Sequence, residues 1–383
     1  MHAHGVARPL PHVDLGARIV QLMLTTGCNL RCKYCYQNRT MPRTMAPEVL
    51  DEAIRRLVAS RYDRPQLVLY GGEPLLAAPL VLRALDRVRQ WAPARMRPDI
   101  RIVTNGTRLD GAKAGLLVSR EVSILLSSDG VAPAQDERAR GSFEILDRLL
   151  VRLRRDHPKH FRERFGVKLT LTSRNTPFLA ASFRYFLSRG VRDVDIYPVL
   201  PDDTGWTARS RRELVRQLAE VVRLSVEEFQ RSGRVPFSVF RGGDSAPRAL
   251  DAPPCGCSSR SALLVDVDGG LGPCSRLAPS MLDSQPWAVR RVGRALCGLH
   301  ITDPDLPASL LRRERRARKL RFLAGRKDRQ GPRGPCAQCK ALPTCFVCPV
   351  ATACNRGRVP RFHCDVNWLF ARYRSEFRRR LTG

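Results

Sequence analysis

The stretch Cys28-Asn29-Leu30-Arg31-Cys32-Lys33-Tyr34-Cys35 carries three cysteines, with gaps of three and two residues between them. It follows the apolar run 19–24, so the three thiols are expected on the loop after a strand. Thiolates so close in sequence can all face one soft metal centre. A structural zinc ion or an ordinary iron–sulfur cluster takes four protein ligands, whereas three leave one position open for a substrate. The alternative is a zinc site completed from elsewhere, although zinc ligands usually come as two CxxC-type pairs.

Short apolar runs alternate with amphipathic helical patterns from residue 18 onward. The runs predict strands at 19–24, 66–70, 100–104, 122–127, 167–172 and 194–199, and the patterns predict helices at 47–60, 76–91, 109–119, 142–155, 178–189 and 209–231. Strands that alternate with helices indicate βαβ units and a parallel sheet. Six such units are two short of a closed (β/α)8 barrel, and in this fold class the chemistry lies at the carboxyl ends of the strands.

Three more motifs follow predicted strands. They are Gly71-Gly72-Glu73-Pro74, Thr104-Asn105-Gly106-Thr107 and Ser127-Ser128-Asp129-Gly130. Two adjacent glycines let a backbone approach a ligand closely, and the carboxylate of Glu73 can accept hydrogen bonds from an ammonium group. All of these motifs, like the cysteine loop, therefore fall at the strand ends where the fold class predicts the active site.

Together these residues resemble the radical S-adenosylmethionine (radical SAM) enzymes. The resemblance implies an α/β fold, a partial (β/α)6 TIM-like barrel, over residues 18–235, preceded by a tail of residues 1–17. In this family three cysteines, here Cys28, Cys32 and Cys35, hold a [4Fe-4S] cluster whose fourth iron binds SAM. Reductive cleavage of SAM then yields a 5′-deoxyadenosyl radical, which abstracts hydrogen from an unactivated C–H bond. The protein orients the cofactor and the substrate and excludes competing reactions.

The same resemblance implies which residues contact SAM. Segment 71–74 is similar to the family's segment that binds the SAM amino group, and 127–130 is similar to the Ser-x-Asp-Gly near the SAM ribose or carboxylate. Segment 136–143 is similar to the Asp…Arg…Gly-Ser-Phe run that usually follows, in which Arg138 and Arg140 are both candidate ligands and either could cap the next helix. The implied cofactor-binding residues are Tyr34, Gly71, Gly72, Glu73, Asn105, Ser127 and Asp129.

Ten of the 13 cysteines lie beyond residue 250. In a chain without an export signal, cysteines are expected to be metal ligands or reactive thiols, not disulfides. Apolar residues on both sides of Asp268-Gly269 predict a hairpin that returns Cys274 to its partners. A basic insertion at about 280–330 follows, and then the run Cys336-x2-Cys339-x5-Cys345-x2-Cys348-Pro349, with Cys354 and Cys364 beyond it.

This pattern resembles the SPASM domain, which is attached to radical SAM enzymes that modify peptides and proteins and binds auxiliary [4Fe-4S] clusters. The resemblance implies such a domain over 255–383, after a linker of 236–254. The gap before Cys348 is one residue shorter than usual, so Cys354 is its natural substitute, and Cys297 is expected to be a buried thiol. One zinc ion clamped by two CxxC pairs is the alternative. The implied ligands are Cys336, Cys339, Cys345 and Cys364 for one cluster, and Cys255, Cys257, Cys274 and Cys348 for the other.

The resemblance further implies a maturase that takes hydrogen from a precursor peptide or protein and forms a crosslink, an epimer or an oxidised residue. A flavodoxin-like or ferredoxin-like electron donor is then expected, and no catalytic residue stands out. Anaerobic sulfatase-maturating, formylglycine-forming enzymes are expected to have Asp where this chain has Ser275, so that activity is the second choice. A small-molecule radical SAM dehydrogenase fits the full cysteine set less well. The non-enzyme alternative is a zinc-dependent nucleic-acid-binding protein.

The formal net charge of +31 suits an acidic partner. Arginines scattered along every helix, rather than in one stripe with aromatics, favour solvated helix faces over nucleic-acid binding. The run 312–319 predicts a surface helix with a basic side, and we expect a separate protein or this surface to bind a substrate leader. No run reaches the ~18 apolar residues of a membrane helix, and no signal peptide occurs, so we expect a cytoplasmic protein without a membrane partner.

Overall fold

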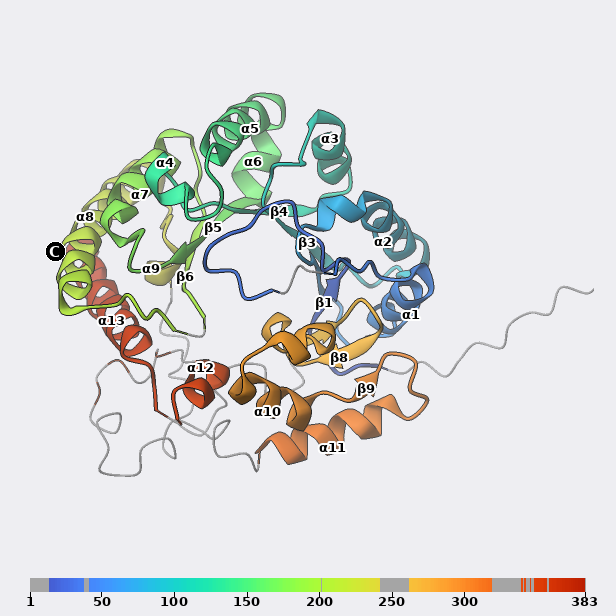
Figure 1. Ribbon diagram of the computed structural model, residues 1–383. Coiled ribbons are helices and arrows are strands. Elements are labelled where there is room, and N and C mark those ends of the chain that lie inside the picture. The colour runs from blue at the N-terminus through green and yellow to red at the C-terminus, as the bar shows by residue number, and fades with distance from the viewer. Residues whose placement is uncertain are drawn as a thin grey trace, which may run out of the picture.

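A computed structural model describes residues 14–37, 41–200, 202–241, 262–318, 339, 341, 345, 348–356 and 358–382. Its centre is one sheet with the strand order β6-β5-β4-β3-β2-β1-β7-β8-β9, which curves into an open arc (Figure 1). The pairs from β6 through to β7 are parallel, and β8 and β9 are added in antiparallel orientation. The strands are β1 (Ile19–Met23), β2 (Gln66–Tyr70), β3 (Asp99–Thr104), β4 (Ser123–Ser127), β5 (Phe165–Leu171), β6 (Val194–Pro198), β7 (Ala262–Val265), β8 (Gly270–Gly272) and β9 (Leu299–His300).

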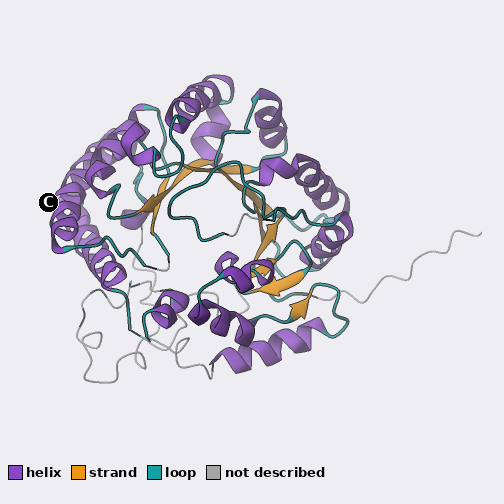
Figure 2. Ribbon diagram, viewed as in Figure 1, coloured by secondary structure: helices purple, strands orange, loops and turns teal. Residues whose placement is uncertain are grey.

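The helices that connect the parallel strands lie outside the arc (Figure 2). The six long ones are α1 (Pro47–Val58), α2 (Ala78–Trp91), α3 (Gly111–Ser119), α5 (Ser142–Asp156), α7 (Leu179–Ser188) and α8 (Ala208–Ser232). Shorter ones are η1 (Pro74–Ala77), α4 (Ala132–Gln135), α6 (Pro158–Arg164), η2 (Thr176–Phe178) and α9 (Ser238–Arg241). Every strand and helix predicted for the barrel is present, with ends within two residues of the prediction, so the partial barrel is confirmed.

Local sequence explains where several of these helices begin and end. Pro47 occupies the first turn of α1, where its missing N–H costs no hydrogen bond. Helix α8 begins with a capping box between Thr207 and Ser210, and it ends at Gly233 in the left-handed conformation with φ 67°. The main hydrophobic core includes alternate strand residues such as Leu67 and Leu69 together with helix residues of the outer layer. The strand ends are thereby held rigidly at one rim of the arc.

The C-terminal part extends the barrel sheet. Strand β7 pairs in parallel with β1, with Val20 opposite Leu263, and a turn ending at Gly269 leads into β8. The predicted hairpin around Asp268-Gly269 is therefore confirmed. The elements that follow are η4 (Ser275–Leu277), η5 (Pro279–Ser284), α10 (Trp287–Leu296), α11 (Leu306–Arg318), α12 (Pro349–Cys354) and α13 (Arg361–Thr382).

Helix α13 packs beside α8 at one end of the arc, although it follows the cysteine-rich region in sequence (Figure 1). The Tyr373 hydroxyl donates to the Val215 carbonyl (2.9 Å), and Phe370 lies edge-on to Phe237 at a centroid distance of 6.3 Å. The end of the chain thus covers barrel helices, an arrangement that local sequence patterns did not predict.

Helix α11 has the two-sided character predicted for residues 312–319. Leu310 and Ala317 are buried, whereas Arg312, Arg315 and Arg316 are exposed. Among the described residues, no helix combines the length and the apolar character that crossing a membrane requires. The predicted ligands Cys255, Cys257 and Cys336, and most of the predicted tail and linker, lie outside the described residues.

Candidate active site

The base of the cysteine loop is fastened to the end of β2. Gly72 N donates to the Thr25 carbonyl and Glu73 N donates to the Gly27 carbonyl, both at 2.8 Å. A Cβ on Gly72 would lie 2.1 Å from the Gly27 oxygen, and one on Gly71 would lie 2.5 Å from the Thr25 oxygen. The close approach that the glycine pair permits is therefore one between two protein backbones, where the sequence suggested an approach to a ligand.

Glu73 ties the end of β2 to the end of β3. Its side chain is fully buried, and burial raises its pKa although hydrogen bonds act in the opposite direction. Oε1 accepts from Thr104 Oγ1 (2.7 Å) and from Leu75 N (3.0 Å), and Oε2 accepts from Asn105 N (2.7 Å). Since a carboxylate has about four acceptor directions, these three donors leave one for a further donor.

Asn105, after β3, contacts the cysteine loop directly. Its Nδ2 donates to Asn29 Oδ1 (3.0 Å) and lies 3.9 Å from Cys28 Sγ. Its Oδ1 accepts from Thr107 N (3.0 Å), and Asn29 Nδ2 donates to Thr107 Oγ1 (2.7 Å). The motif after β3 thus fixes the first part of the loop, next to its first cysteine.

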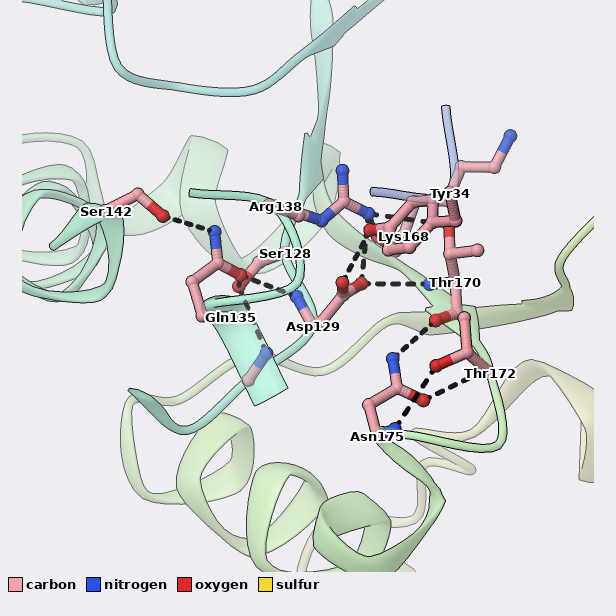
Figure 3. Close-up of polar contacts among 11 residues, drawn as sticks. Tyr34, Ser128, Asp129, Gln135, Arg138, Ser142, Lys168, Thr170, Thr172 and Asn175 are labelled. Carbon is pink, nitrogen blue, oxygen red and sulfur yellow. Dashed lines mark hydrogen bonds and ion pairs between the residues drawn. The ribbon is translucent and has the colours of Figure 1, made fainter. Parts of the chain in front are cut away.

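A buried polar cluster fixes the other end of the loop (Figure 3). Tyr34 lies between Cys32 and Cys35, and its hydroxyl donates to Asp129 Oδ2 at 2.5 Å. Asp129 Oδ1 accepts from Arg138 Nη2 (3.0 Å) and from Thr170 N (3.1 Å). The Arg138 guanidinium also lies over the Tyr34 ring, 5.4 Å from its centroid. Burial raises the pKa of Tyr34 well above its ordinary value, so its hydroxyl remains a donor at neutral pH.

This cluster distinguishes between two arginines that the sequence left equivalent. Arg138 is buried and paired with Asp129, whereas Arg140 is exposed. Helix α5 begins at Ser142 after Gly141, without a side-chain cap at that position, so neither arginine serves as its N-cap. The buried Nε of Arg138 has no acceptor among the described residues. An anionic ligand beside the loop would satisfy this donor.

Sequence motifs did not identify Gln135, which supports the same cluster (Figure 3). Asp129 N donates to Gln135 Oε1 (2.8 Å), and Gln135 Nε2 donates to Ser142 Oγ (3.0 Å). Gln135 is almost completely buried in the short helix α4, and no motif in the sequence indicated this position. The predicted ligand Ser127 is the last residue of β4, half-buried and opposite Lys168 in the strand register.

The three thiols of the loop are all half-buried, and Cys35 N donates to the Cys32 carbonyl (3.1 Å). Within the described ranges, no three His, Cys, Asp or Glu side chains converge closely enough to hold one metal ion. An iron–sulfur cubane separates its thiolates more widely than a single ion does, so this spread is compatible with a cluster. A donor set of three thiols without imidazole or carboxylate also fits iron–sulfur chemistry.

Residues 22–163 match the model of the radical SAM superfamily. This part of the chain is a radical SAM domain. Enzymes of this superfamily use SAM and [4Fe-4S] clusters. The matched residues contain the cysteine loop and the motifs after β2, β3 and β4.

Known radical SAM proteins are similar to this one over most of its length. The cysteine-type anaerobic sulfatase-maturating enzyme of Clostridium perfringens (strain 13 / Type A) is 23% identical over 273 residues, which are 65% of this chain and 72% of that protein. Native anSMEcpe with bound AdoMet and Kp18Cys peptide shares the fold with a TM-score of 0.61 and 18% identity, over 82% of this chain and 90% of that one. Streptococcus suis SuiB bound to precursor peptide SuiA has a TM-score of 0.50 and 12% identity, over 67% of this chain and 59% of that one. Both structures are of SPASM-type radical SAM enzymes.

A cavity of about 610 Å³ opens beside the cysteine loop of this domain. Its volume is within the range of small-molecule and cofactor sites. Its charged lining is mixed, with Lys33, Arg174 and Arg276 balanced by Glu137, Asp202 and Asp203. The cavity is bounded by loop residues 33–36, by residues after β5 and β6, and by Arg276 and residues 284–286 of the C-terminal part.

Tyr36 joins the cysteine loop to the C-terminal part. Its hydroxyl donates to Ser275 Oγ (2.9 Å) and lies 2.9 Å from the Tyr70 hydroxyl, and its carbonyl accepts from Gln285 Nε2 (2.9 Å). Burial raises the pKa of Tyr36 and of Tyr70, so both phenols are protonated at neutral pH. Ser275, which directly follows Cys274, is thus part of a hydroxyl cluster.

Four cysteines of the C-terminal part pack into one small hydrophobic cluster. They are Cys274, Cys297, Cys348 and Cys354, and Cys348 and Cys354 stand at the two ends of α12. The Cys297 thiol donates to the Leu277 carbonyl (3.3 Å), and burial raises its pKa to about 12, as expected for an inert buried thiol. Of the other predicted ligands, Cys339 and Cys345 are half-buried and Cys364 is exposed on α13.

Proposed function

We propose that this protein is a radical SAM enzyme and a SPASM-type maturase that modifies a peptide or protein. In this proposal Cys28, Cys32 and Cys35 hold a [4Fe-4S] cluster that binds SAM. When bound, these groups supply the 5′-deoxyadenosyl radical that abstracts hydrogen from the substrate. The residues proposed to line the SAM site are Tyr34, Gly71, Gly72, Glu73, Asn105, Ser127, Asp129 and, in addition, Arg138.

The position of the cavity is the observation that carries this proposal. One wall is the loop that ends at Cys35, and another comes from the segment that begins just after Cys274. A substrate bound there would lie between the proposed SAM cluster and the proposed auxiliary-cluster region. The mixed charges of the lining suit the polar backbone and side chains of a peptide.

The polar contacts of the site support a role in holding the loop and excluding water. Asn105 orients the segment around Cys28, and the pair Tyr34–Asp129 orients the segment between Cys32 and Cys35. The Nε of Arg138, which has no acceptor in the described part of the chain, is a donor for an anionic group such as the carboxylate of SAM. Because these donors and acceptors are buried, they need little reorganisation when a charged ligand binds.

The class of substrate and the bond that is formed in it are also proposed. Crosslinking, epimerisation or oxidation of a residue are the product classes that we propose first. The sulfatase-maturating enzymes are expected to have a carboxylate directly after the equivalent of Cys274, whereas here Ser275 and its neighbours Tyr36 and Tyr70 place hydroxyls at that position. Formylglycine formation remains the second candidate, and the similarity to the sulfatase-maturating enzyme supports it.

The comparisons also support a peptide partner. Structures of anSMEcpe and SuiB contain a peptide and a precursor peptide, respectively. We further propose a flavodoxin-like or ferredoxin-like electron donor. A separate leader-binding protein or the exposed arginines of α11 would bind the leader of the substrate.

Anaerobic reconstitution tests this function. Loaded wild-type protein should bind about twelve irons, from three clusters of four, and should convert SAM to 5′-deoxyadenosine after reduction. The variant Cys32→Ala should lose that conversion but keep the irons of the C-terminal part, whereas Cys297→Ala should keep both. Full SAM conversion by Cys32→Ala, or a protein that binds zinc and no iron, would reject the proposal. Peptides encoded by short reading frames beside the gene are the first substrates to test, with products identified by mass spectrometry.

A further inference from the structure

Arg276 is a buried arginine with two donors that lack partners. Its side chain is 5% exposed, and its Nε and Nη1 are buried without an acceptor among the described residues. An arginine keeps its charge in a protein, so such a position calls for an anionic partner. The guanidinium is held in place by the Tyr36 ring, whose centroid lies 4.8 Å from Cζ.

The anionic partner of Arg276 has two potential sources, which are a substrate in the cavity and a group held by the protein on the other side. Arg276 lines the cavity, but its Nε and Nη1 are the buried atoms, so a substrate that enters the cavity does not reach them in this arrangement. On the protein side, Arg276 lies between Cys274, two residues before it, and Leu277, which packs with Cys348 and Cys354. These three thiols pack in the same small hydrophobic cluster. A partner held by these cysteines, and not a diffusing substrate, therefore fits the two donors.

We propose that Arg276 is the positively charged partner of an auxiliary [4Fe-4S] cluster held beside Cys274, Cys348 and Cys354, and that it raises the reduction potential of that cluster. This inference rests on the proposed function, which places an auxiliary cluster there. A cluster gains negative charge when it accepts an electron, so a neighbouring cation stabilises the reduced form more than the oxidised form. Hydrogen bonds to the sulfur atoms act in the same direction.

The position of Arg276 also connects the two cysteine regions. It follows Cys274 by two residues, and it stacks on Tyr36, which directly follows Cys35. Arg276 thereby links the wall of the cavity to the segment that carries Cys274.

The experiment uses full-length protein with Cys28, Cys32 and Cys35 all replaced by Ala, so that every remaining cluster signal comes from the C-terminal part. Arg276→Met removes the charge and keeps a long side chain against Tyr36, and Arg276→Lys keeps the charge. Arg56→Met is the matched control, because Arg56 is similarly buried, its Nη1 also lacks an acceptor among the described residues, and it lies on α1. Each protein is reconstituted anaerobically, its iron is counted, and its clusters are titrated with dithionite and followed by electron paramagnetic resonance.

Arg276→Met should shift the midpoint potential of one auxiliary cluster to a more negative value. Arg276→Lys should shift it less, and Arg56→Met should not shift it. Loss of iron from Arg276→Met but not from Arg276→Lys would also support the proposal, because the charge would then be required for binding. An unchanged midpoint in fully loaded Arg276→Met overturns it, and so does an equal loss of iron from both Arg276 variants, which indicates a packing role. If the triple Cys→Ala protein with its native Arg276 holds no iron at all, the proposed auxiliary cluster does not exist, and Arg276 has no such partner.

Discussion

Tyr34 and Asp129 are joined by a 2.5 Å hydrogen bond that connects the cysteine loop to the end of β4. The two residues are 95 positions apart in the sequence, and each belongs to a different motif of the proposed SAM site. Arg138 contacts both partners, since it donates to the Asp129 carboxylate and lies over the Tyr34 ring. The geometry of the loop therefore depends on this buried triad as well as on the thiols.

Replacing Tyr34 with Phe should weaken the attachment of the cysteine loop to the end of β4, while the aromatic ring still fills its site. The variant loses one hydrogen bond to a charged group, worth about 1.5–3 kcal/mol, while Asp129 keeps its contacts with Arg138 and Thr170. Formation of 5′-deoxyadenosine should fall by about tenfold or more, while iron binding is retained. Tyr62→Phe, far from the loop, is the control. Wild-type turnover in Tyr34→Phe would show that the hydrogen bond does not position the loop.

Gly72 should tolerate no side chain. The Cβ of Gly72→Ala would lie 2.1 Å from the Gly27 carbonyl oxygen, so the backbone at the base of the cysteine loop must move. We expect a loss of stability of about 1–3 kcal/mol and a clear drop in SAM cleavage. Gly111→Ala is the matched control, because a Cβ there meets nothing within 4 Å. Thermal unfolding and 5′-deoxyadenosine assays compare the two variants, and equal behaviour would contradict the argument.

Local sequence patterns predicted the strands and helices of the barrel well, because the residues that determine each element lie within it or next to it. Alternating burial, Pro47 in a first turn and Gly233 after a last turn are visible within a few residues. The pairing of β7 with β1 and the packing of α13 on α8 were not predicted, since periodicity does not say which sheet edge or helix a segment will meet. The site shows the same division. The motifs that contain Glu73 and Thr104-Asn105 were both identified, but the buried hydrogen bonds between them were not predicted.

Glu73 should make stability depend on pH in a defined direction. Its pKa is raised by burial above the ordinary value of 4.5, so the folded state binds this proton more tightly than the unfolded state. The resulting stability is present below that ordinary value and is lost as the pH rises through the folded pKa. In Glu73→Gln this contribution is absent, and the new amide places a donor against existing donors at a cost of about 1–3 kcal/mol.

Chemical unfolding of wild type and Glu73→Gln at several pH values tests this direction. The stability advantage of the wild type should be largest below pH 4.5 and should shrink as the pH rises toward neutral. Glu48→Gln, which removes an exposed carboxyl group from the first turn of α1, is the control. An advantage that grows with pH would mean that the folded state favours the ionised Glu73, contrary to the effect of burial.

The exposed arginines of α11 should decide whether this helix binds an acidic leader. Arg312, Arg315 and Arg316 lie on its outer side, and replacing all three with Ser removes three charges without disturbing buried Leu310 and Ala317. If the leader binds there, its affinity should fall and the dependence of affinity on salt should become shallower, because exposed charges are screened by salt. Affinity is measured by fluorescence anisotropy of a labelled precursor at several salt concentrations.

The matched control replaces Arg209, Arg212 and Arg216 on α8, which are equally exposed and lower the net charge by the same amount. A general effect of net charge would reduce affinity in both triple variants alike, whereas a specific surface on α11 reduces it only in the first. If neither variant changes affinity or its salt dependence, α11 is not the leader site, and a separate leader-binding protein becomes the explanation to pursue. The proposed chemistry at the cysteine loop would be unaffected by that result, because α11 contributes no residue to the lining of the cavity.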